Sequence, residues 1–345
     1  MAITKIPAAG FTGNNFRNII INGDMSIAQR GTSATGLGNG DSGYFTCDRW
    51  TFLESGTTTY EFTMSQDTDV PSGQGFATSL KLDCTTADAS LDANNLIRIA
   101  QIIEGQNLQY LKYGTANATS LTASFWVKST VTGDYSVNLY NYGSGGGARI
   151  ISSIYTINSA DTWEKKTITF DGDTVEAIIN NNTAGLNLAF SLGSGTDYTT
   201  TDATSWGSYS NGKLAYGQVA NIASSTDNNF YITGVQLEAG TASDFEFLPV
   251  DVNLARCLRY FQIPEEITIR PQVVSRYINQ EVRFPVQMRA TPTLTQTFAD
   301  TSAVSSSSSL QQRGNKGLVA TFAYSSIGAT TGRTLISGIT ATAEL

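Results

Sequence analysis

The sequence predicts an all-β protein, in which a jelly-roll β-sandwich is followed by a short connector helix and a smaller C-terminal β domain. Apolar and polar residues alternate with period two over most of the first 247 residues, as in strands with one buried and one solvated face. Clusters of Gly, Asp, Ser and Thr separate these runs, and no long helical pattern interrupts them. Charge and proline content then change near residue 248, which indicates a domain boundary.

The predicted organisation has four parts. These are an N-terminal arm (1–15), the jelly-roll β-sandwich (16–247), the connector helix (248–262) and the C-terminal β domain (263–345). After residue 248 there are nine basic residues and six acidic ones, whereas the first 248 residues hold twelve basic and twenty-three acidic ones. Five of the seven prolines and none of the four tryptophans lie in the second segment, and such a shift is typical of a change of domain.

Three runs show the alternation of the sandwich most clearly, and their apolar members are predicted to face its core. These members are Leu121, Ala123, Phe125 and Val127; Tyr135, Val137 and Leu139; and Leu186, Leu188, Phe190 and Leu192. Many short strands with turn residues between them favour two packed antiparallel sheets.

The period of the hydrophobic pattern changes between Pro249 and Gln262. Leu254, Leu258 and Phe261 follow one another at helical spacing, which predicts a short amphipathic helix that begins near Asp251. Alternation returns later, at Phe284, Val286 and Met288. We therefore expect a second, smaller β domain after the helix.

Composition excludes several classes of function. The 345 residues include no histidine, which removes the Ser-His-Asp triad, HExxH zinc sites and histidine-carboxylate iron sites. The acidic larger segment disfavours nucleic acid and anionic membranes as partners, because phosphate groups need Lys and Arg. No apolar run is long enough to span a bilayer, and residues 1–10 lack the pattern of a signal peptide, so neither membrane insertion nor export by that route is expected.

The acidic residues and the cysteines do not form a recognisable reactive set. Two carboxylates can support glycoside hydrolysis, but no spacing singles out a pair. The candidates are Asp41, Asp48, Glu54, Glu164, Asp171 and Asp173. We therefore expect no catalysis, no cofactor and no metal, with a Ca²⁺ ion in the 171–173 turn left open as an alternative. The three cysteines are widely spaced and predicted to be buried, unpaired side chains.

Aromatic residues on solvated faces are the candidate binding residues. If Leu139 points into the core, Tyr140 and Tyr142 point outward, and Trp206, Tyr209 and Tyr216 lie in another Gly/Ser/Asn-rich stretch. Exposed rings beside amides and hydroxyls suit stacking on the C–H faces of sugars. The alternative is that these rings cover the edge of the sandwich or pack against a neighbouring subunit.

The glycine-rich stretch 143–148 fits a degenerate dinucleotide-binding fingerprint. The residues after it, from Arg149 to Ile157, are β-branched, so no helix N-terminus would follow to hold a pyrophosphate. We interpret this stretch as the loop of a β-hairpin.

Several segments together resemble bacteriophage tail fibre and virion appendage proteins that carry a carbohydrate-binding-module-like jelly roll. The opening N-I-I-I-N-G-D-M-S-I-A-Q-R-G-T (18–32) with C-D-R-W (47–50) is similar to the start of such proteins. The matching blocks continue in order along the chain, at 124–129, 133–135, 162–166, 232–238, 245–249, 254–262 and 284–292.

This resemblance implies a structural protein of the virion, folded in the cytoplasm of the host bacterium and displayed on the particle. It also implies a homo-oligomer, expected to be a trimer, that contacts other virion proteins and host cell-surface glycans without catalysis. The short arm 1–15 differs from the extended attachment region of many fibres, so a head fibre, capsid decoration or tail-assembly protein with a purely structural role is the alternative. A depolymerase that uses two carboxylates is the third hypothesis.

Overall fold

The computed structural model describes residues 16–269, 277–299, 309–323 and 334–345. The predicted N-terminal arm 1–15 lies outside these ranges. The chain separates into two compact units, Met1–Leu248 and Pro249–Leu345.

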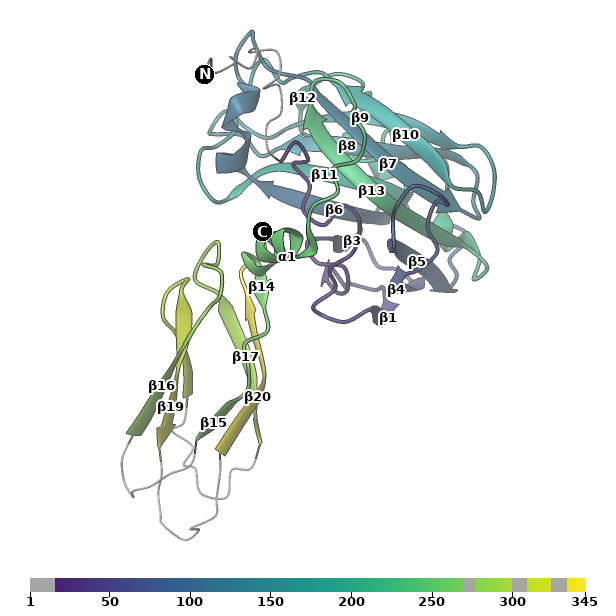
Figure 1. Ribbon diagram of the computed structural model, residues 1–345. Coiled ribbons are helices and arrows are strands. Elements are labelled where there is room, and N and C mark those ends of the chain that lie inside the picture. Colours follow the sequence, from purple (N-terminus) through teal and green to yellow (C-terminus); the bar gives the residue numbers. More distant parts are fainter. Residues whose placement is uncertain (1–15, 270–276, 300–308, 324–333) are drawn as a thin grey trace, which may run out of the picture. The chain divides into compact units, whose positions relative to one another are not determined.

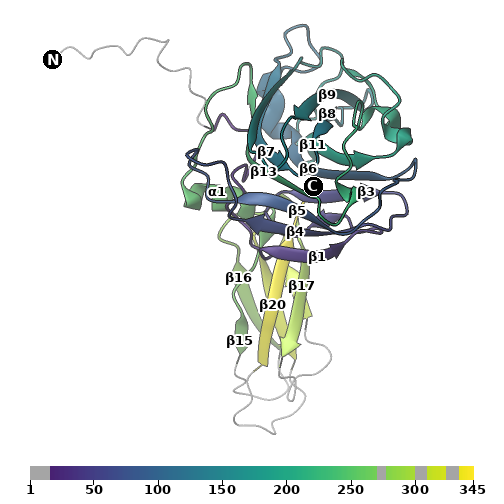
Figure 2. The ribbon, with the colours of Figure 1, turned by 90° about the vertical axis from the view of Figure 1, so that its right-hand side faces the viewer.

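The first unit is a sandwich of two sheets, whose layers are visible in Figures 1 and 2. The six-stranded sheet has the order β1 (Ser33–Leu37), β4 (Glu61–Asp67), β5 (Ser79–Thr86), β13 (Asn229–Ala239), β7 (Leu121–Ser129) and β10 (Glu164–Phe170). The seven-stranded sheet has the order β12 (Gly207–Ser208), β9 (Arg149–Ile157), β8 (Gly133–Asn141), β11 (Ala184–Ser194), β6 (Leu96–Glu104), β3 (Thr51–Ser55) and β2 (Gly43–Tyr44). Neighbours in both sheets pair antiparallel, and many are distant in sequence. The predicted all-β sandwich is confirmed.

The core between the sheets is filled by the residues that the alternation selects. The apolar members of all three runs are buried in one cluster. Phe125 of β7 meets Phe190 of β11 and Tyr155 of β9 edge to face, at centroid distances of 4.9 and 5.1 Å. These contacts join the two sheets, because β7 belongs to one and β9 and β11 to the other.

Two segments near the start of the chain, 18–32 and 47–50, pack together against the core of the sandwich. Trp50 is fully buried, and its indole N–H donates to the carbonyl of Asn22 at 3.0 Å. The Asn22 amide in turn donates to the carbonyls of Ile27 and Asp48, at 2.8 and 3.0 Å. The N-I-I-I-N-G-D-M and C-D-R-W blocks therefore meet in a buried hydrogen-bond network that holds the first turns against the core.

The second unit is also built of β-strands, in two small sheets. In one sheet β20 (Thr334–Thr342) pairs with β14 (Phe261–Gln262), β15 (Ile267–Ile269) and β17 (Thr293–Ala299). In the other, β19 (Gly317–Ala323) lies between β16 (Tyr277–Arg283) and β18 (Ser309–Gln312). Buried residues of both sheets, such as Ile336 and Leu318, share one core. The predicted C-terminal β domain is confirmed.

The helix that opens this unit is shorter than predicted. The structure has α1 at Val250–Leu258, whereas Phe261–Gln262 pairs with Ala341 and Thr342 of β20. The Gln262 side-chain amide donates to the Leu258 carbonyl at 2.8 Å, which satisfies an acceptor at the helix end. The buried helix positions are Asn253 and Cys257, so the expected stripe of Leu254, Leu258 and Phe261 is not its most buried side.

The alternation at Phe284, Val286 and Met288 does not form a strand. The segment follows β16 as an irregular turn, in which the N–H groups of Phe284 and Met288 donate to the carbonyls of Lys316 and Asn315 at 2.9 Å each. Pro285 has no N–H to contribute to a ladder, which explains the irregularity. Phe284 and Met288 are nevertheless buried in the core of this unit.

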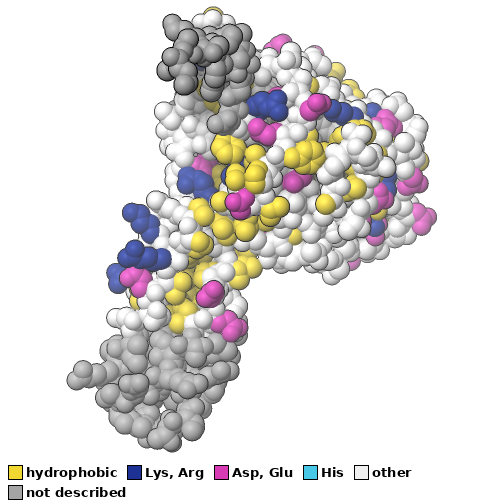
Figure 3. Space-filling model, viewed as in Figure 1, with side chains coloured by type: hydrophobic (Ala, Val, Ile, Leu, Met, Phe, Trp, Pro, Cys, Tyr) yellow, Lys and Arg dark blue, Asp and Glu magenta, His cyan; other side chains and the backbone are white. Residues whose placement is uncertain are grey.

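The surface and the cysteines agree with the composition. Cys47, Cys84 and Cys257 are buried and free, as predicted. On the face that Figure 3 shows, charged side chains of both signs are scattered among uncharged ones on the larger unit. Within the described ranges, no helix has the length and apolar character that crossing a membrane requires.

Candidate functional site

Two of the predicted rings, Tyr140 and Tyr142, lie at the end of β8. Leu139 fills the core, so its neighbour Tyr140 faces the outer side of the seven-stranded sheet. There Tyr140 lies beside Asn187 of β11 and Ile150 of β9 in the register of the sheet. Tyr142 follows two residues later and is 36% exposed.

Segment 195–220 packs on the same outer side. The amide of Asn138 donates to the Leu214 carbonyl, and the hydroxyl of Ser152 donates to the Lys213 carbonyl, each at 2.7 Å. Tyr198, Leu214 and Ala215 of the segment form a small second core with Leu96 and Ile150 of the sheet. This packing holds the segment in place and fixes the residues that it carries.

Three of the five predicted rings meet on this surface, which we call the tyrosine face (Tyr140, Tyr142 and Tyr209). Tyr140 contacts Tyr142 edge to face at a centroid distance of 4.7 Å, and it contacts Tyr209 in the same way at 5.2 Å. Tyr140 is half-buried between them, while Tyr209 is 40% exposed and its hydroxyl donates to Asn211 Oδ1 at 2.6 Å. The exposed rings available to a ligand are therefore those of Tyr142 and Tyr209.

The structure does not bring Trp206 and Tyr216 into this cluster. Trp206 packs edge to face on Tyr113 at 5.9 Å, and its indole N–H donates to the Asp171 carbonyl at 2.6 Å. Arg149 also donates to the Trp206 carbonyl at 3.0 Å, so this ring anchors a loop. Tyr216 is half-buried and contacts no other aromatic ring of the described chain.

Arg98 is a site residue that the sequence analysis did not select. It lies on β6, paired in register with Ser191, on the outer side of the sheet. Its Nε is buried, and within the described chain the guanidinium has no hydrogen-bond acceptor and no carboxylate partner. Burial lowers the pKa of Arg98, and the phenol groups of Tyr209, Tyr142 and Tyr198 act in the opposite direction, which places them near the guanidinium.

Further polar atoms on this side of the sheet are buried and unpaired. They are the amide oxygens of Asn138 and Asn187 and the hydroxyl of Ser136. A buried acceptor without a donor is costly, so such atoms indicate a surface that a ligand or water completes. The signal in the sequence was weak, because Arg98 stands alone in the apolar run Leu96–Ala100.

Burial also affects the tyrosines themselves. It raises the pKa of Tyr142 to about 12, with a further contribution from Tyr140. The pKa values of Tyr140 and Tyr209 are likewise raised by burial. All three phenols therefore stay neutral at physiological pH and present hydrogen-bonding hydroxyls on apolar rings.

The glycine-rich loop beside the tyrosine face is the hairpin that joins β8 and β9, as predicted. Its backbone amides bind the carboxylate of Glu176, with Ser144 N donating at 2.7 Å and Gly146 N at 3.2 Å. These donors, Ser144 first, lower the pKa of Glu176. Because this carboxylate occupies the loop, the loop has no vacancy for a phosphate.

The carboxylates near this region have structural partners. Asp173 is fully buried, and both of its oxygens accept from Arg149 Nε, at 3.0 and 3.1 Å. It also accepts from the Asn141 amide at 3.2 Å. In the described ranges, no cluster of three Cys, Asp or Glu residues has the arrangement of a metal site.

Comparison with known proteins finds only distant structural similarity. No family model matches the chain, and no curated protein sequence matches it either. A crystal structure of the enzymatically active domain of bacteriophage CBA120 tailspike protein 4 matches 65% of this chain and 22% of that chain, with 14% identity and a TM-score of 0.36.

Two carbohydrate-binding modules also match. A family 30 module matches 68% of this chain and 91% of its own, with 12% identity and a TM-score of 0.32. The family 11 module of a Clostridium thermocellum cellulase matches 61% of this chain and 97% of its own, with 10% identity and a TM-score of 0.30. Each TM-score lies below 0.5, so the function has to follow from this chain's own residues.

Proposed function

We propose that this chain is a structural protein of a bacteriophage particle, a tail fibre or receptor-binding component, which binds acidic glycans of the host surface without cutting them. The observation that carries the proposal is the guanidinium of Arg98, unpaired within the described chain, on the same outer side of the sheet as the exposed rings of Tyr142 and Tyr209, with which it interacts electrostatically. The ordered sequence blocks from 18–32 to 284–292 support the placement in a virion.

The chemistry of the tyrosine face selects the ligand. A partly desolvated Arg without a counter-charge favours a carboxylate, which it can bind through two parallel hydrogen bonds. Exposed tyrosine rings stack on the C–H faces of a sugar, and their hydroxyls bond to its oxygen atoms. A sugar that carries a carboxylate, such as a uronic or sialic acid, satisfies both features at once.

The contacts of the acidic residues favour binding of a glycan without its hydrolysis. Asp173 is bound to Arg149, Glu164 to Lys166, and Glu176 to the backbone of its neighbouring loop. A glycosidase instead needs two carboxyl groups that face a substrate. Weak single sites become effective through repetition, and a trimer with several copies per particle gains about 10²–10⁴ in avidity over one site.

Substitution of Arg98 tests the proposal on the full chain. We expect R98Q to weaken binding of a sialylated or uronate-containing oligosaccharide by about 30-fold or more, the size typical for loss of one partner of a desolvated charge pair. R98K should restore only part of the affinity, because Lys lacks the planar fork. Isothermal titration calorimetry measures both, with R283Q as the control that removes an exposed guanidinium elsewhere.

Stability separates a binding role from a structural one. If Arg98 is kept for a ligand, R98Q should leave the unfolding temperature unchanged or raise it, since it removes an unpaired desolvated charge. A lower unfolding temperature with unchanged binding would contradict the proposal. So would the failure of the wild-type oligomer to bind any acidic glycan on a dense array, which would favour the purely structural alternative.

A further inference from the structure

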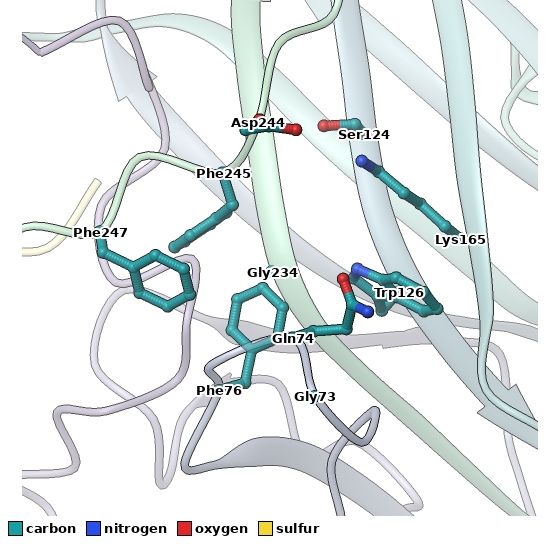
Figure 4. Close-up of a pocket in the computed structure, with 10 residues that line it drawn as sticks. All are labelled: Gly73, Gln74, Phe76, Ser124, Trp126, Lys165, Gly234, Asp244, Phe245 and Phe247. Atoms are coloured by element: carbon teal, nitrogen blue, oxygen red, sulfur yellow. The ribbon is translucent and has the colours of Figure 1, made fainter.

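A pocket of about 190 Å³ lies on the outer side of the other, six-stranded sheet (Figure 4). Its lining comes from β7, β10, β13, the loop before β5 and the segment 244–247. Ligand pockets for drug-sized molecules commonly measure about 300–1,000 Å³. This smaller pocket therefore has room for one sugar ring rather than for a chain of them.

Trp126 stands at one side of the pocket because of the register of the sheet. Leu121, Ala123, Phe125 and Val127 point into the core, so Trp126 points outward from β7. It lies between Lys165 of β10 and Thr233 of β13. The ring is half-buried, which leaves part of its surface available to a ligand.

The opposite wall is apolar and depends on an irregularity in β13. The strand shifts register between Thr233 and Gln236, and Gly234 there has φ +60°. A Cβ at Gly234 would lie 2.5 Å from Phe76 Cζ, so only glycine allows the Phe76 ring this position. Phe76 also contacts the rings of Phe245 and Phe247, at 5.1 Å each.

Polar side chains complete the pocket at both ends. Figure 4 shows the Asp244 carboxylate, the Ser124 hydroxyl and the Lys165 ammonium turned toward one another at one end, and the Gln74 amide beside the Trp126 indole at the other. Within the described chain, these five side chains have no hydrogen bond or ion pair.

Polar residues next to the pocket form hydrogen bonds or ion pairs, unlike the five side chains that line it. Ser243, next to Asp244, donates to Glu238 at 2.7 Å, and Gln236 donates to Glu238 at 2.8 Å. Lys128, two residues from Trp126, forms an ion pair with Asp69. Unpaired donors and acceptors therefore line the hollow beside paired neighbours, as in a site shaped for a polar ligand.

We propose that this pocket is a second binding site, independent of the tyrosine face, and that it holds one N-acetylated amino sugar. The C–H face of the sugar ring lies against Trp126, and the acetamido methyl contacts the Phe76 wall. The acetamido group pairs with Gln74 beside Trp126, because the Gln74 amide supplies both a donor for the C=O and an acceptor for the N–H. Asp244, Ser124 and Lys165, at the other end of the pocket, bind hydroxyl groups of the sugar ring. Lys165 and Asp244 carry opposite charges, so the pocket favours a neutral ligand, unlike Arg98.

The test compares N-acetylglucosamine with glucose, which shares the ring and lacks the acetamido group. In an NMR titration of the full chain, we expect N-acetylglucosamine to bind about 10-fold more tightly or better, the discrimination typical of one methyl contact plus paired polar groups. Equal binding of glucose would overturn the assignment. So would equal binding of rhamnose, whose methyl group is not attached through an amide.

Variants test whether N-acetylglucosamine binds in this pocket, and whether that binding is independent of acidic glycan binding at the tyrosine face. W126A and D244N should each weaken binding of N-acetylglucosamine by about 10-fold while leaving acidic glycan binding intact. D244N changes an exposed side chain, so it stays informative if W126A fails to fold. Y142A is the reciprocal control and should affect only the acidic glycan. Loss of N-acetylglucosamine binding in Y142A but not in D244N would overturn the second site.

Discussion

The two outer sides of the sandwich are both formed by the outward residues of alternating strands, but they carry different chemical groups. On the seven-stranded sheet, two exposed tyrosines lie on the same outer side as Arg98, whose guanidinium has no acceptor within the described chain, and segment 195–220 brings one of the rings. On the six-stranded sheet, a tryptophan faces a phenylalanine wall, and the charges of Lys165 and Asp244 balance each other. The first surface suits an anionic ligand and the second a neutral one.

Strands and loops both contribute to this difference, since Arg98, Trp126 and Lys165 lie on strands. Both sheets present outward residues at every second position, yet Tyr209, Phe76 and Asp244 all come from connecting segments. Strands supply a rigid platform, and loops add the groups that complete a site on it. Each site should therefore respond to changes in its own loops, and both should respond to changes in the shared core.

The largest effect is expected from Trp50. Its loss should destabilise the core that supports both outer faces and so weaken both binding sites together. W50A leaves a large cavity and an unpaired Asn22 carbonyl, so we expect the free energy of unfolding to fall by about 3–5 kcal/mol. Urea unfolding measures this change. W163A is the matched control, because Trp163 is only half-buried and its loss should cost much less. Similar losses for the two variants would contradict the central role of Trp50.

A smaller and more selective effect is expected from Gly234. G234A places a methyl group against Phe76 at a positive φ, and we expect a loss of about 1–3 kcal/mol in stability with weaker N-acetylglucosamine binding. Binding of acidic glycans should not change, which would sharpen the contrast between the two faces. G240A is the matched control, because Gly240 has φ +80° and no neighbour within 4 Å of its Cβ position. An equal loss of sugar binding in G240A would show that strain alone accounts for the effect.

The smallest effect is expected from Glu164, at the start of β10. Burial acts to raise its pKa, but Lys166, Ser159 N and the Asn158 groups outweigh this and lower the pKa of Glu164 to about 2. Its contribution to stability is therefore complete above its ordinary pKa of 4.5 and is lost as the pH falls from there toward 2. E164Q should show a shallower decline of unfolding free energy over this acid range, measured by urea unfolding at several pH values. E281Q, at an exposed carboxylate, should decline as the wild type does; identical curves for E164Q and the wild type would refute the pairing.

Local pattern in the sequence indicated part of the candidate tyrosine face, but it did not indicate Arg98 or the pocket at Trp126. Tyr140 and Tyr142 were predicted to face outward because Leu139 faces inward, and the exposed position of Tyr142 follows directly. Trp206 and Tyr216 lie in the same kind of sequence, yet Trp206 anchors a loop against Tyr113. A polar, glycine-rich stretch indicates that an aromatic ring in it lies near the surface. It does not indicate whether another segment of the chain covers that ring.

The sequence by itself determined the class of fold and the inward members of β7, β8 and β11. Those features depend on hydrophobic periodicity and composition, which neighbouring residues carry together. Only the tertiary structure decided that Arg98 lies unpaired among tyrosines and that Gly234 lies under Phe76. Such contacts join residues far apart in the chain, and they depend on strand order and register, which no local pattern contains.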